Sequence, residues 1–387
     1  MKRVLLRGPF LTVSGYGVHA RQVARWALQN PNWDVKFQTL GWGITPWILD
    51  KNAEMGLAGK IMERSISHDN IVGFDLSIQV QLPNEWDSRL ARTNIGITAA
   101  VETDKCNPQW IDCCNKMNAV VVPSSHTKKT LMNSGKVTSP IHVIPESFYD
   151  EILHSRSSST NFNFSTSFNF LVFGQITGNN PENDRKNLFY TLKWMFEEFR
   201  NEKDVGIVFK ANSGKMTKID RAVTTKFVTQ IVKEARGSEF PRIHLVHGNM
   251  KNEEMIDLMT HPTVKCMVSL TRGEGYGLPL LESAAVGLPI IATNWSGHTD
   301  FLDEENYLPV DYSLVNVHES RIDGKIFVPG SKWAMPAEAD AKKKMRKFYQ
   351  KSNTVKYKAT EMSKRIRKDY SFASVSKLYD QKLADFI

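Results

Sequence analysis

The stretch from Val264 to Thr293, VKCMVSLTRGEGYGLPLLESAAVGLPIIAT, constrains the fold more than any other part of the chain. It begins with a short apolar run typical of a strand, and a glycine-rich loop follows. Apolar residues then recur at helical spacing, with Pro279 suited to the first helical turn and Gly287 to the stop. A second apolar strand ends the stretch. We therefore predict a strand, a loop, a helix and a strand around one candidate binding site.

Two carboxylates and several glycines suit this stretch to a ligand made of sugars and phosphate. Glu274 lies in the loop and Glu282 early in the helix, with an E-x7-E spacing. The free N–H groups at a helix start favour an anionic group, and glycines let a ligand approach the backbone closely. A carboxylate accepts hydrogen bonds from the vicinal diol of a ribose or of another sugar. The loop residues expected at the ligand are Gly275, Tyr276, Gly277 and Leu278.

This stretch resembles the E-x7-E signature of the retaining glycosyltransferases of the GT4 type, which belong to the GT-B superfamily. The resemblance extends from SGYG near the N-terminus to the KWAMP segment that begins at Lys332. It implies an α/β protein with the GT-B fold, in which two Rossmann-like, doubly wound domains face a cleft. It also implies that Glu282 holds the ribose and Glu274 the donor sugar. The alternative, an ordinary turn with two solvated glutamates, is disfavoured because spacing, glycines and context agree.

A second glycine motif, SGYG followed by Ala20, lies between an expected strand and an expected helix near the N-terminus. It matches G-x-G-x-x-A, a pattern of dinucleotide sites. Such a site also needs an acidic residue after the second strand, where this chain has Gln38 and Thr39, so an oxidoreductase is disfavoured. In GT4-like proteins the equivalent loop contacts the donor diphosphate, which the resemblance assigns to Gly15 and Gly17. A tight turn without a ligand is the alternative.

Short apolar runs and helical periodicities alternate along the chain, which predicts parallel sheets covered by helices on both faces. The elements expected in the first half are Arg3–Leu6, a helix from about Val18, Val35–Leu40, Phe74–Val80, Asn94–Ala100, Pro108–Met117, Ala119–Pro123, Ser125–Asn133 and Ile141–Pro145. The second half adds Phe170–Gly174, Leu188–Phe199, Val205–Lys210, Ile243–His247 and Glu253–Met259. We expect an acceptor domain over 1–150, joined by a C-terminal helix at about 362–387, a linker over 151–168, and a nucleotide-sugar domain over 169–361.

Basic residues suited to a leaving diphosphate lie in the second half. Arg185 and Lys186 end one loop, and Lys210 ends the next expected strand. They resemble the phosphate-binding elements of the family, although the chain has Gln175 where many members carry an arginine. The alternative is that these cations are only solvated. We expect the strand at Ile243–His247 to end beside the glutamate loop and to line a slot for the base.

The resemblance places Glu102 or Asp104 at a position near the anomeric carbon where many relatives carry a histidine. Of the two, Glu102 is the candidate contact to the acceptor, and a purely structural role is the alternative. No two aspartates form a D-x-D pair, the metal motif of the other large glycosyltransferase fold. The resemblance therefore implies hexosyl or pentosyl transfer from a UDP- or GDP-sugar, with retention and without a metal. Cations and helix dipoles would stabilise the leaving diphosphate. Two other functions stay open, a nucleotide-sugar-binding protein without transfer activity and a nucleotide-sugar epimerase of the same fold.

Positive charge is concentrated near the C-terminus. Between Lys342 and Lys368 there are twelve Lys and Arg against one acidic residue, Glu361, while the whole chain carries +9. Such a patch is typical of proteins that bind a polyanion, here an acceptor such as DNA with hydroxylated bases, an anionic membrane with a lipid acceptor, or an acidic glycan. A solvated basic helix is the alternative. The residues predicted to contact the polyanion are Lys342, Lys343, Lys344, Arg346, Lys347, Lys364, Arg365, Arg367 and Lys368.

The remaining composition places few other limits on the protein. No apolar run approaches the length of a membrane span, and Arg7 interrupts the start before a signal-peptide core forms. The four cysteines lack the spacing of a zinc site or of a disulfide framework. We expect a soluble cytoplasmic protein, with peripheral attachment to a membrane as an open alternative.

Overall fold

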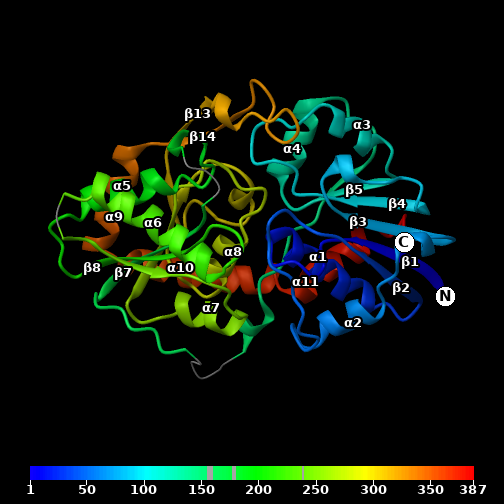
Figure 1. Ribbon diagram of the computed structural model, residues 1–387, viewed down its shortest axis with the longest axis horizontal. Coiled ribbons are helices and arrows are strands. Elements are labelled where there is room, and N and C mark those ends of the chain that lie inside the picture. The colour runs from blue at the N-terminus through cyan, green and yellow to red at the C-terminus, as the bar shows by residue number, and fades with distance from the viewer. Residues whose placement is uncertain (155–159, 177–179, 238) are drawn as a thin grey trace. The chain divides into compact units, whose positions relative to one another are not determined.

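The computed structural model of the chain describes residues 1–154, 160–176, 180–237 and 239–387. Its internal contacts divide the chain into two units (Figure 1). The first unit contains Met1–Ser147, Asp323–Ser331 and Phe372–Ile387, and the second contains Phe148–Ile322 and Lys332–Ser371. Both units are therefore assembled from segments that are far apart in the sequence.

The first unit is built on a parallel sheet with the strand order β2-β1-β3-β4-β5-β6 in the described part of the chain. The strands are β1 (Lys2–Gly8), β2 (Trp33–Thr39), β3 (Phe74–Val80), β4 (Ala91–Ile97), β5 (Ala119–Val122) and β6 (Ile141–Val143). The order reverses between β1 and β3. In open α/β sheets ligands bind beyond the carboxyl ends of the strands at such a switch point.

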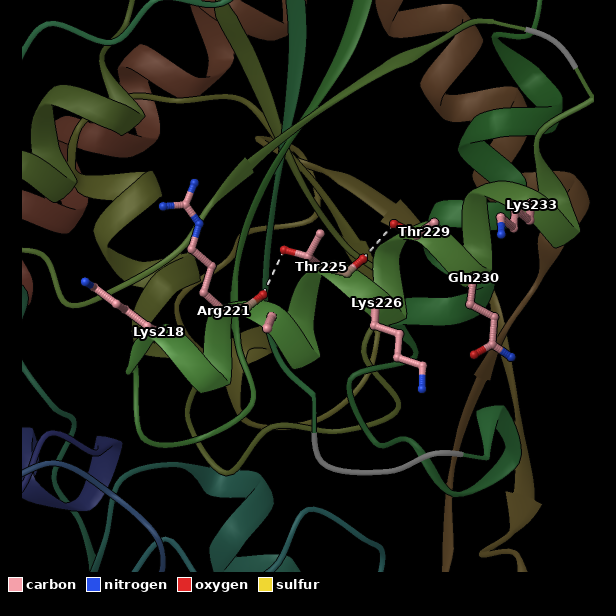
Figure 2. A pocket seen from close by; sticks show the side chains of 8 residues that line it. Lys218, Arg221, Thr225, Lys226, Thr229, Gln230 and Lys233 are labelled. Atoms are coloured by element: carbon pink, nitrogen blue, oxygen red, sulfur yellow. Dashed lines mark hydrogen bonds between the residues drawn. The ribbon is translucent and has the colours of Figure 1, made fainter.

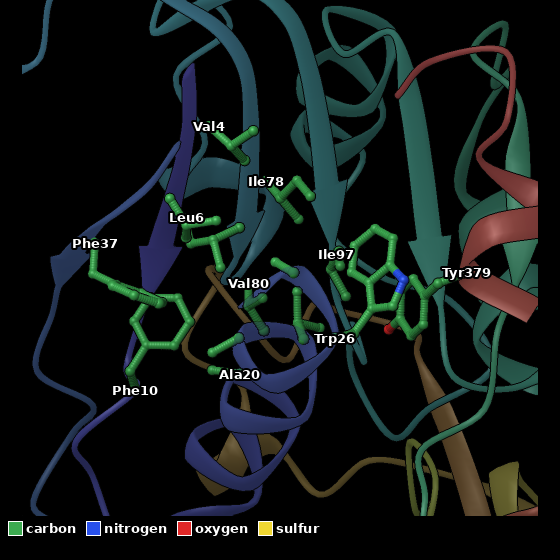
Figure 3. Close-up of a cluster of buried hydrophobic side chains, with 14 of the residues drawn as sticks. Val4, Leu6, Phe10, Ala20, Trp26, Phe37, Ile78, Val80, Ile97 and Tyr379 are labelled. Atoms are coloured by element: carbon green, nitrogen blue, oxygen red, sulfur yellow. The ribbon is translucent and has the colours of Figure 1, made fainter. Parts of the chain in front are cut away.

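Helices cover both faces of this sheet (Figure 1). They are α1 (Gly15–Leu28), α2 (Leu57–Glu63), α3 (Gln109–Asn115), α4 (Ser125–Ser134) and α11 (Phe372–Lys382). On the face with α1 and α11, Trp26 stacks on Tyr379 at 4.8 Å between ring centroids (Figure 3). The Trp26 indole also donates to Asp380 at 2.8 Å. Each buried aromatic ring contributes roughly 1.5–3 kcal/mol, so this contact anchors the C-terminal segment to the first unit.

The second unit contains a parallel sheet with the order β12-β11-β10-β7-β8-β9 in its described residues. Its strands are β7 (Phe168–Gln175), β8 (Val205–Asn212), β9 (Arg242–Val246), β10 (Val264–Ser269), β11 (Ile290–Thr293) and β12 (Leu308–Val310). A separate antiparallel pair consists of β13 (Tyr312–Asn316) and β14 (Lys332–Pro336). The strand order of the large sheet reverses between β7 and β10, which makes that edge its switch point.

Alternating side chains bury the second sheet on both faces. Phe170 and Val172 of β7 join the cluster under α5, α6 and α9, whereas Leu171 joins the cluster under α7, α8 and α10. This period of two is what a doubly covered strand requires. The helices are α5 (Leu188–Glu198), α6 (Lys218–Ala235), α7 (Asn252–Met259), α8 (Leu278–Ala285), α9 (Glu338–Gln350) and α10 (Asn353–Asp369). Single turns of 3-10 helix occur at His68–Asn70, Pro83–Glu85, Asp150–Leu153, Pro181–Asn183, Gly297–Asp300 and Glu319–Arg321.

Two sequence expectations about the elements are wrong. α1 begins at Gly15 and not near Val18, because the Ser14 side chain caps the helix by accepting from the N–H of Gly17 at 2.9 Å. The strand expected to end beside the glutamate loop, β9, is the outer strand, and β8 and β7 separate it from β10. Strand neighbours depend on long-range pairing, which local periodicity does not encode.

One long helix, α6, has no counterpart among the expected elements. It spans 18 residues and begins after Thr217, whose side chain accepts from the N–H of Asp220. Thr217 and Asp220 are a capping pair that the sequence already contains.

The expected linker at 151–168 is only partly described, since residues 155–159 lie outside the described residues. Beyond them, Phe162 and Phe164 pack against the cluster under α7, α8 and α10. His261 contacts both rings edge-on. These two phenylalanines therefore hold the segment before β7 against the second unit.

Candidate functional site

The centre of the candidate site is the loop that joins β10 to α8. Gly277 ends the loop at the N-cap of α8 with φ of 104°, a conformation that favours glycine. Among the described residues, no side-chain hydrogen bond caps the start of α8. Its first backbone N–H groups therefore stay available, and together with the helix dipole they favour a bound anion. The loop has a fixed shape because the Glu274 N–H donates to Ser296 Oγ at 2.8 Å and the Gly297 N–H donates to the Glu274 carbonyl at 2.9 Å.

Glu274 lies within an ion cluster with two of the predicted phosphate-binding cations. Lys186 Nζ lies 2.5 Å from Glu274 Oε1, and an Arg185 nitrogen lies 3.3 Å from Glu274 Oε2. Arg185 also donates to the Gly273 carbonyl at 2.6 Å. Glu274 is only 8% exposed. Burial alone would raise its pKa, but Lys186 and Arg185 lower it to about 2, so the carboxylate is ionised near neutral pH.

The cluster is positioned by the segment before α5. Asp184 accepts from the N–H of Lys186 at 3.0 Å and from the N–H of Leu188 at 2.7 Å, which caps the helix and turns the two basic side chains toward the loop. The Arg272 N–H donates to the Arg185 carbonyl at 2.8 Å. The loops after β7 and β10 are thus joined at the switch point of the sheet.

Glu282 lies in α8 and is 3% exposed. Its pKa is shifted in the opposite direction to that of Glu274. Burial raises its pKa to about 8, and a hydrogen bond with the Tyr149 side chain opposes the shift. No ion pair to Glu282 occurs within the described residues. Its carboxyl group is therefore largely protonated at neutral pH, when it can both donate and accept a hydrogen bond. Tyr149 could not be found from the sequence, because only tertiary packing brings it to Glu282.

The other predicted residues of the second unit have diverse environments. Lys210 lies in β8, where its ammonium donates to the Gly248 carbonyl at 2.6 Å and burial lowers its pKa to about 8. It therefore contacts the loop after β9, and no ion pair joins it to the Glu274 cluster within the described residues.

The Tyr276 ring packs on Phe301 at 5.2 Å and is buried. Gly275 is in close contact with Gly297, where an added Cβ would lie 2.1 Å from the Gly275 carbonyl oxygen.

His298, in the single 3-10 turn Gly297–Asp300, is a further polar residue near the loop. It is fully buried beside the loop, and its Cβ would lie 3.1 Å from a Cβ built on Gly277. Nε2 lies 2.7 Å from the Thr293 carbonyl oxygen and so carries the proton, while Nδ1 is buried without a protein partner in the described residues. Burial lowers the pKa of His298, which keeps the ring neutral.

Gly15, Gly17 and Glu102 belong to the first unit. A Cβ on Gly17 would lie 2.2 Å from the Thr12 carbonyl oxygen, whereas nothing lies within 4 Å of one on Gly15. Gly17 is therefore needed for packing, and Gly15 is open at the exposed start of α1. The Tyr16 hydroxyl lies 3.0 Å from Thr98 Oγ1, just after β4. Burial raises the pKa of Tyr16, and the nearby charge of Glu102 adds to that effect.

Carboxylates neutralise much of the basic patch predicted near the C-terminus. Lys342 pairs with Glu197 of α5 at 2.5 Å, and Arg346 pairs with Glu198 and Glu202, each at 2.6 Å. Lys344 pairs with Asp340 and Lys364 with Glu361. Arg365 and Arg367 donate to the carbonyls of Phe301 and Ala285. The count of charges along the sequence missed these partners because most of them lie outside the counted segment. Lys343 and Lys347 are exposed, and Lys368 is engaged within the protein.

Within the described residues, no group of three or more His, Cys, Asp or Glu side chains is arranged to hold a metal ion. None of the helices in the same part of the chain is both long and apolar enough to cross a bilayer.

Residues 227–312 match the family described as Glycosyl transferases group 1. The match runs from within α6 to the start of β13 and includes both Glu274 and Glu282. This part of the chain is therefore a glycosyltransferase group 1 domain. No curated protein sequence matches the chain.

Solved structures share the fold of the entire chain. HepE of Anabaena, in complex with UDP and glucose, has a TM-score of 0.65 at 10% identity, with 100% of each chain covered. Sucrose-phosphate synthase of Thermosynechococcus elongatus has a TM-score of 0.66 at 13% identity, again with 100% of each chain covered. The lipopolysaccharide outer core galactosyltransferase WaaB, in its apo form, has a TM-score of 0.60 at 14% identity and the same coverage. At these identities the likeness establishes the fold, which is the GT-B fold of glycosyltransferases.

Proposed function

We propose that this protein is a retaining glycosyltransferase of the GT4 type, which moves a hexosyl or pentosyl group from a nucleotide-sugar to an acceptor hydroxyl. The observation that carries the proposal is the ion cluster of Glu274, Arg185 and Lys186 at the switch point of the second sheet. The family match over residues 227–312 supports it, since it includes both glutamates of the E-x7-E pattern.

The two cations of the cluster are assigned to the donor diphosphate. Arg185 and Lys186 pair with Glu274, whose Cβ lies 3.8 Å from a Cβ built on Gly277 at the start of α8, so side-chain charge and helix dipole lie in one region. A diphosphate gains negative charge as the bond to the sugar breaks, and fixed cations and N–H groups stabilise that charge. We predict that these groups replace a divalent metal. Lys210, which donates to the Gly248 carbonyl, is assigned to the same ligand.

The two glutamates are assigned to the two sugars of the donor. Glu274 stays ionised and accepts hydrogen bonds from hydroxyls of the transferred sugar. Glu282, beside Tyr149, binds the ribose diol, whose two hydroxyls each donate and accept hydrogen bonds. The backbone of Gly275, Gly277 and Leu278 supports close approach of the donor, and Tyr276 holds the loop on Phe301.

The reaction itself requires little covalent work from the protein. The bond between the anomeric carbon and the diphosphate oxygen breaks, and the acceptor oxygen bonds to that carbon on the same face. The acceptor proton passes to the departing diphosphate. The protein supplies position and electrostatic stabilisation. We assign the acceptor to the first unit, with Glu102 as one contact, and Gly15 and Gly17 to the donor diphosphate.

The nature of donor and acceptor is also part of the proposal. HepE was crystallised with UDP and with UDP-glucose, which favours a uridine nucleotide over a guanosine nucleotide here. The net charge of +9 favours an anionic acceptor, such as modified DNA, an anionic lipid or an acidic glycan.

A donor panel tests the proposal. UDP- and GDP-sugars are incubated with the protein, with and without candidate acceptors, and release of nucleoside diphosphate is measured. Release that requires an acceptor, with a product that keeps the anomeric configuration of the donor, supports the proposal. A changed sugar without any acceptor would identify an epimerase instead. Donor binding without conversion under every condition would identify a binding protein.

A further inference from the structure

The exposed surface of α6 carries a row of basic side chains (Figure 2). Lys218, Arg221, Lys226 and Lys233 line one shallow hollow along this helix, and we call these four residues the α6 row. All four are exposed. The sequence pattern did not predict α6, so these four residues were not among the predicted contacts to a polyanion.

The α6 row differs from the C-terminal patch in how its charge is compensated. None of its four cations forms an ion pair with a carboxylate in the part of the chain that the structure describes. The acids of α6 are otherwise engaged: Asp220 accepts from the backbone of Ser213, and Glu234 accepts from Gln230. Within the described residues, no carboxylate therefore compensates the positive charge of the α6 row.

A pocket of about 510 Å³ with a mixed lining adjoins the row and shares Lys226 and Gln230 with it, and its lining includes the carboxylates Asp184 and Glu234. Its apolar lining comes from the loop after β7, from α5 and from α6: Ile176, Pro181, Phe189, Val223, Phe227 and Ile231. The volume falls in the range of roughly 300–1,000 Å³ that is usual for ligand pockets. Ile219 and Val223 of α6 are also 78% and 51% exposed. Cations and apolar surface thus lie next to each other.

We propose that α6 docks on an anionic lipid bilayer, with lipid phosphates on the α6 row and an acyl chain in the adjoining pocket. A surface of this kind binds through apolar burial together with attraction to anionic lipids. Duplex DNA offers phosphates but no apolar chain, so it would leave the pocket and Ile219 without a partner. The inference concerns attachment of the second unit, and the pocket shares Asp184 with the segment that positions Arg185 and Lys186.

Vesicle sedimentation with the full chain tests this proposal. Vesicles of phosphatidylcholine are compared with vesicles that also contain phosphatidylglycerol, at low and at raised salt. Binding is expected only with phosphatidylglycerol and weakens as salt rises. Each basic residue near an anionic leaflet strengthens binding about fivefold, so Lys218→Gln, Arg221→Gln, Lys226→Gln and Lys233→Gln together lower affinity by at least about tenfold.

The chain offers a control with the same change in charge. Lys51→Gln, Lys60→Gln, Lys116→Gln and Lys129→Gln together remove four exposed cations of the first unit, outside both the α6 row and the C-terminal patch, and this variant is expected to keep the binding. A second variant, Ile219→Ser with Val223→Ser, tests the apolar part and is expected to weaken binding at raised salt. Thermal unfolding checks that each variant is folded. Equal losses in both charge variants, an α6 variant that binds like wild type, or salt-dependent binding to duplex DNA without vesicle binding would each overturn the proposal.

Discussion

Lys186 Nζ and Glu274 Oε1 lie 2.5 Å apart although 88 positions separate the two residues in the sequence. This ion pair joins the loop after β7 to the loop after β10. Arg185 lies on the other oxygen of the same carboxylate at 3.3 Å. In the proposed donor site, a diphosphate would compete with Glu274 for these cations, which would link donor binding to the position of the carboxylate.

Replacing Lys186 by alanine should lower kcat/KM for the donor by about a hundredfold, because a fixed cation at a developing charge contributes about that much. Steady-state kinetics over a range of donor concentrations measures the effect. Lys193→Ala is the matched control, since Lys193 forms an ion pair with Glu197 on the surface of α5, away from Glu274. A kcat/KM of Lys186→Ala equal to that of the control would remove Lys186 from the diphosphate site.

Replacing Glu274 by alanine should lower turnover more than affinity for the nucleotide. The carboxylate is assigned to the transferred sugar, and its removal leaves Arg185 and Lys186 available to the diphosphate. Affinity for the nucleoside diphosphate is therefore expected to stay unchanged or to rise, while kcat falls. Calorimetry with the diphosphate and with the intact donor separates the two effects. Parallel losses for both ligands would argue against the assignment.

Replacing Glu282 by alanine should weaken donor binding by about 0.5–1.5 kcal/mol for each hydrogen bond lost to the ribose, the range for a carboxyl group that is neutral near pH 7. Isothermal titration with the donor measures it, and circular dichroism checks the fold. Undiminished affinity in a folded variant would show that Glu282 does not hold the ribose.

Glu282 should also make stability depend on pH. Its pKa is raised from 4.5 to about 8 by burial, so the folded state holds a proton that the unfolded state releases between these values. The stabilising contribution is complete below pH 4.5 and is lost as pH rises toward 8, by up to about 1.4 kcal/mol per unit. Denaturant unfolding of wild type and Glu282→Gln should therefore show a difference that grows in favour of Gln as pH rises. A difference independent of pH would contradict this account.

Transfer activity should survive a chelator. Arg185, Lys186 and the start of α8 are assigned the role that a divalent ion has in D-x-D enzymes. Initial rates are measured in EDTA and after addition of magnesium or manganese. Activity that disappears in EDTA and returns with either ion would defeat this prediction.

The sequence predicted the fold class because the burial pattern of each strand and helix is local. β10, its loop and α8 follow from the apolar runs, Pro279 and the glycines of one short stretch. Most other elements also lie within a few residues of their predicted bounds. Two helices differ from the prediction at their N-caps. α1 starts earlier than predicted, directly after its Ser14 cap, and α6, which was not predicted, starts after its Thr217 cap.

The sequence by itself determined the strand-loop-helix unit and the candidates Glu274, Glu282, Arg185 and Lys186, whereas the tertiary structure decided which of them meet. It brought Arg185 and Lys186 to Glu274 and left Lys210 at Gly248. Tyr149 lies beside Glu282, and β9 is the edge strand of its sheet. Lys342 and Arg346 form ion pairs with carboxylates of α5. The physical reason is that periodicity and capping act over a few residues, while strand order and ion pairing act between segments that only folding brings together.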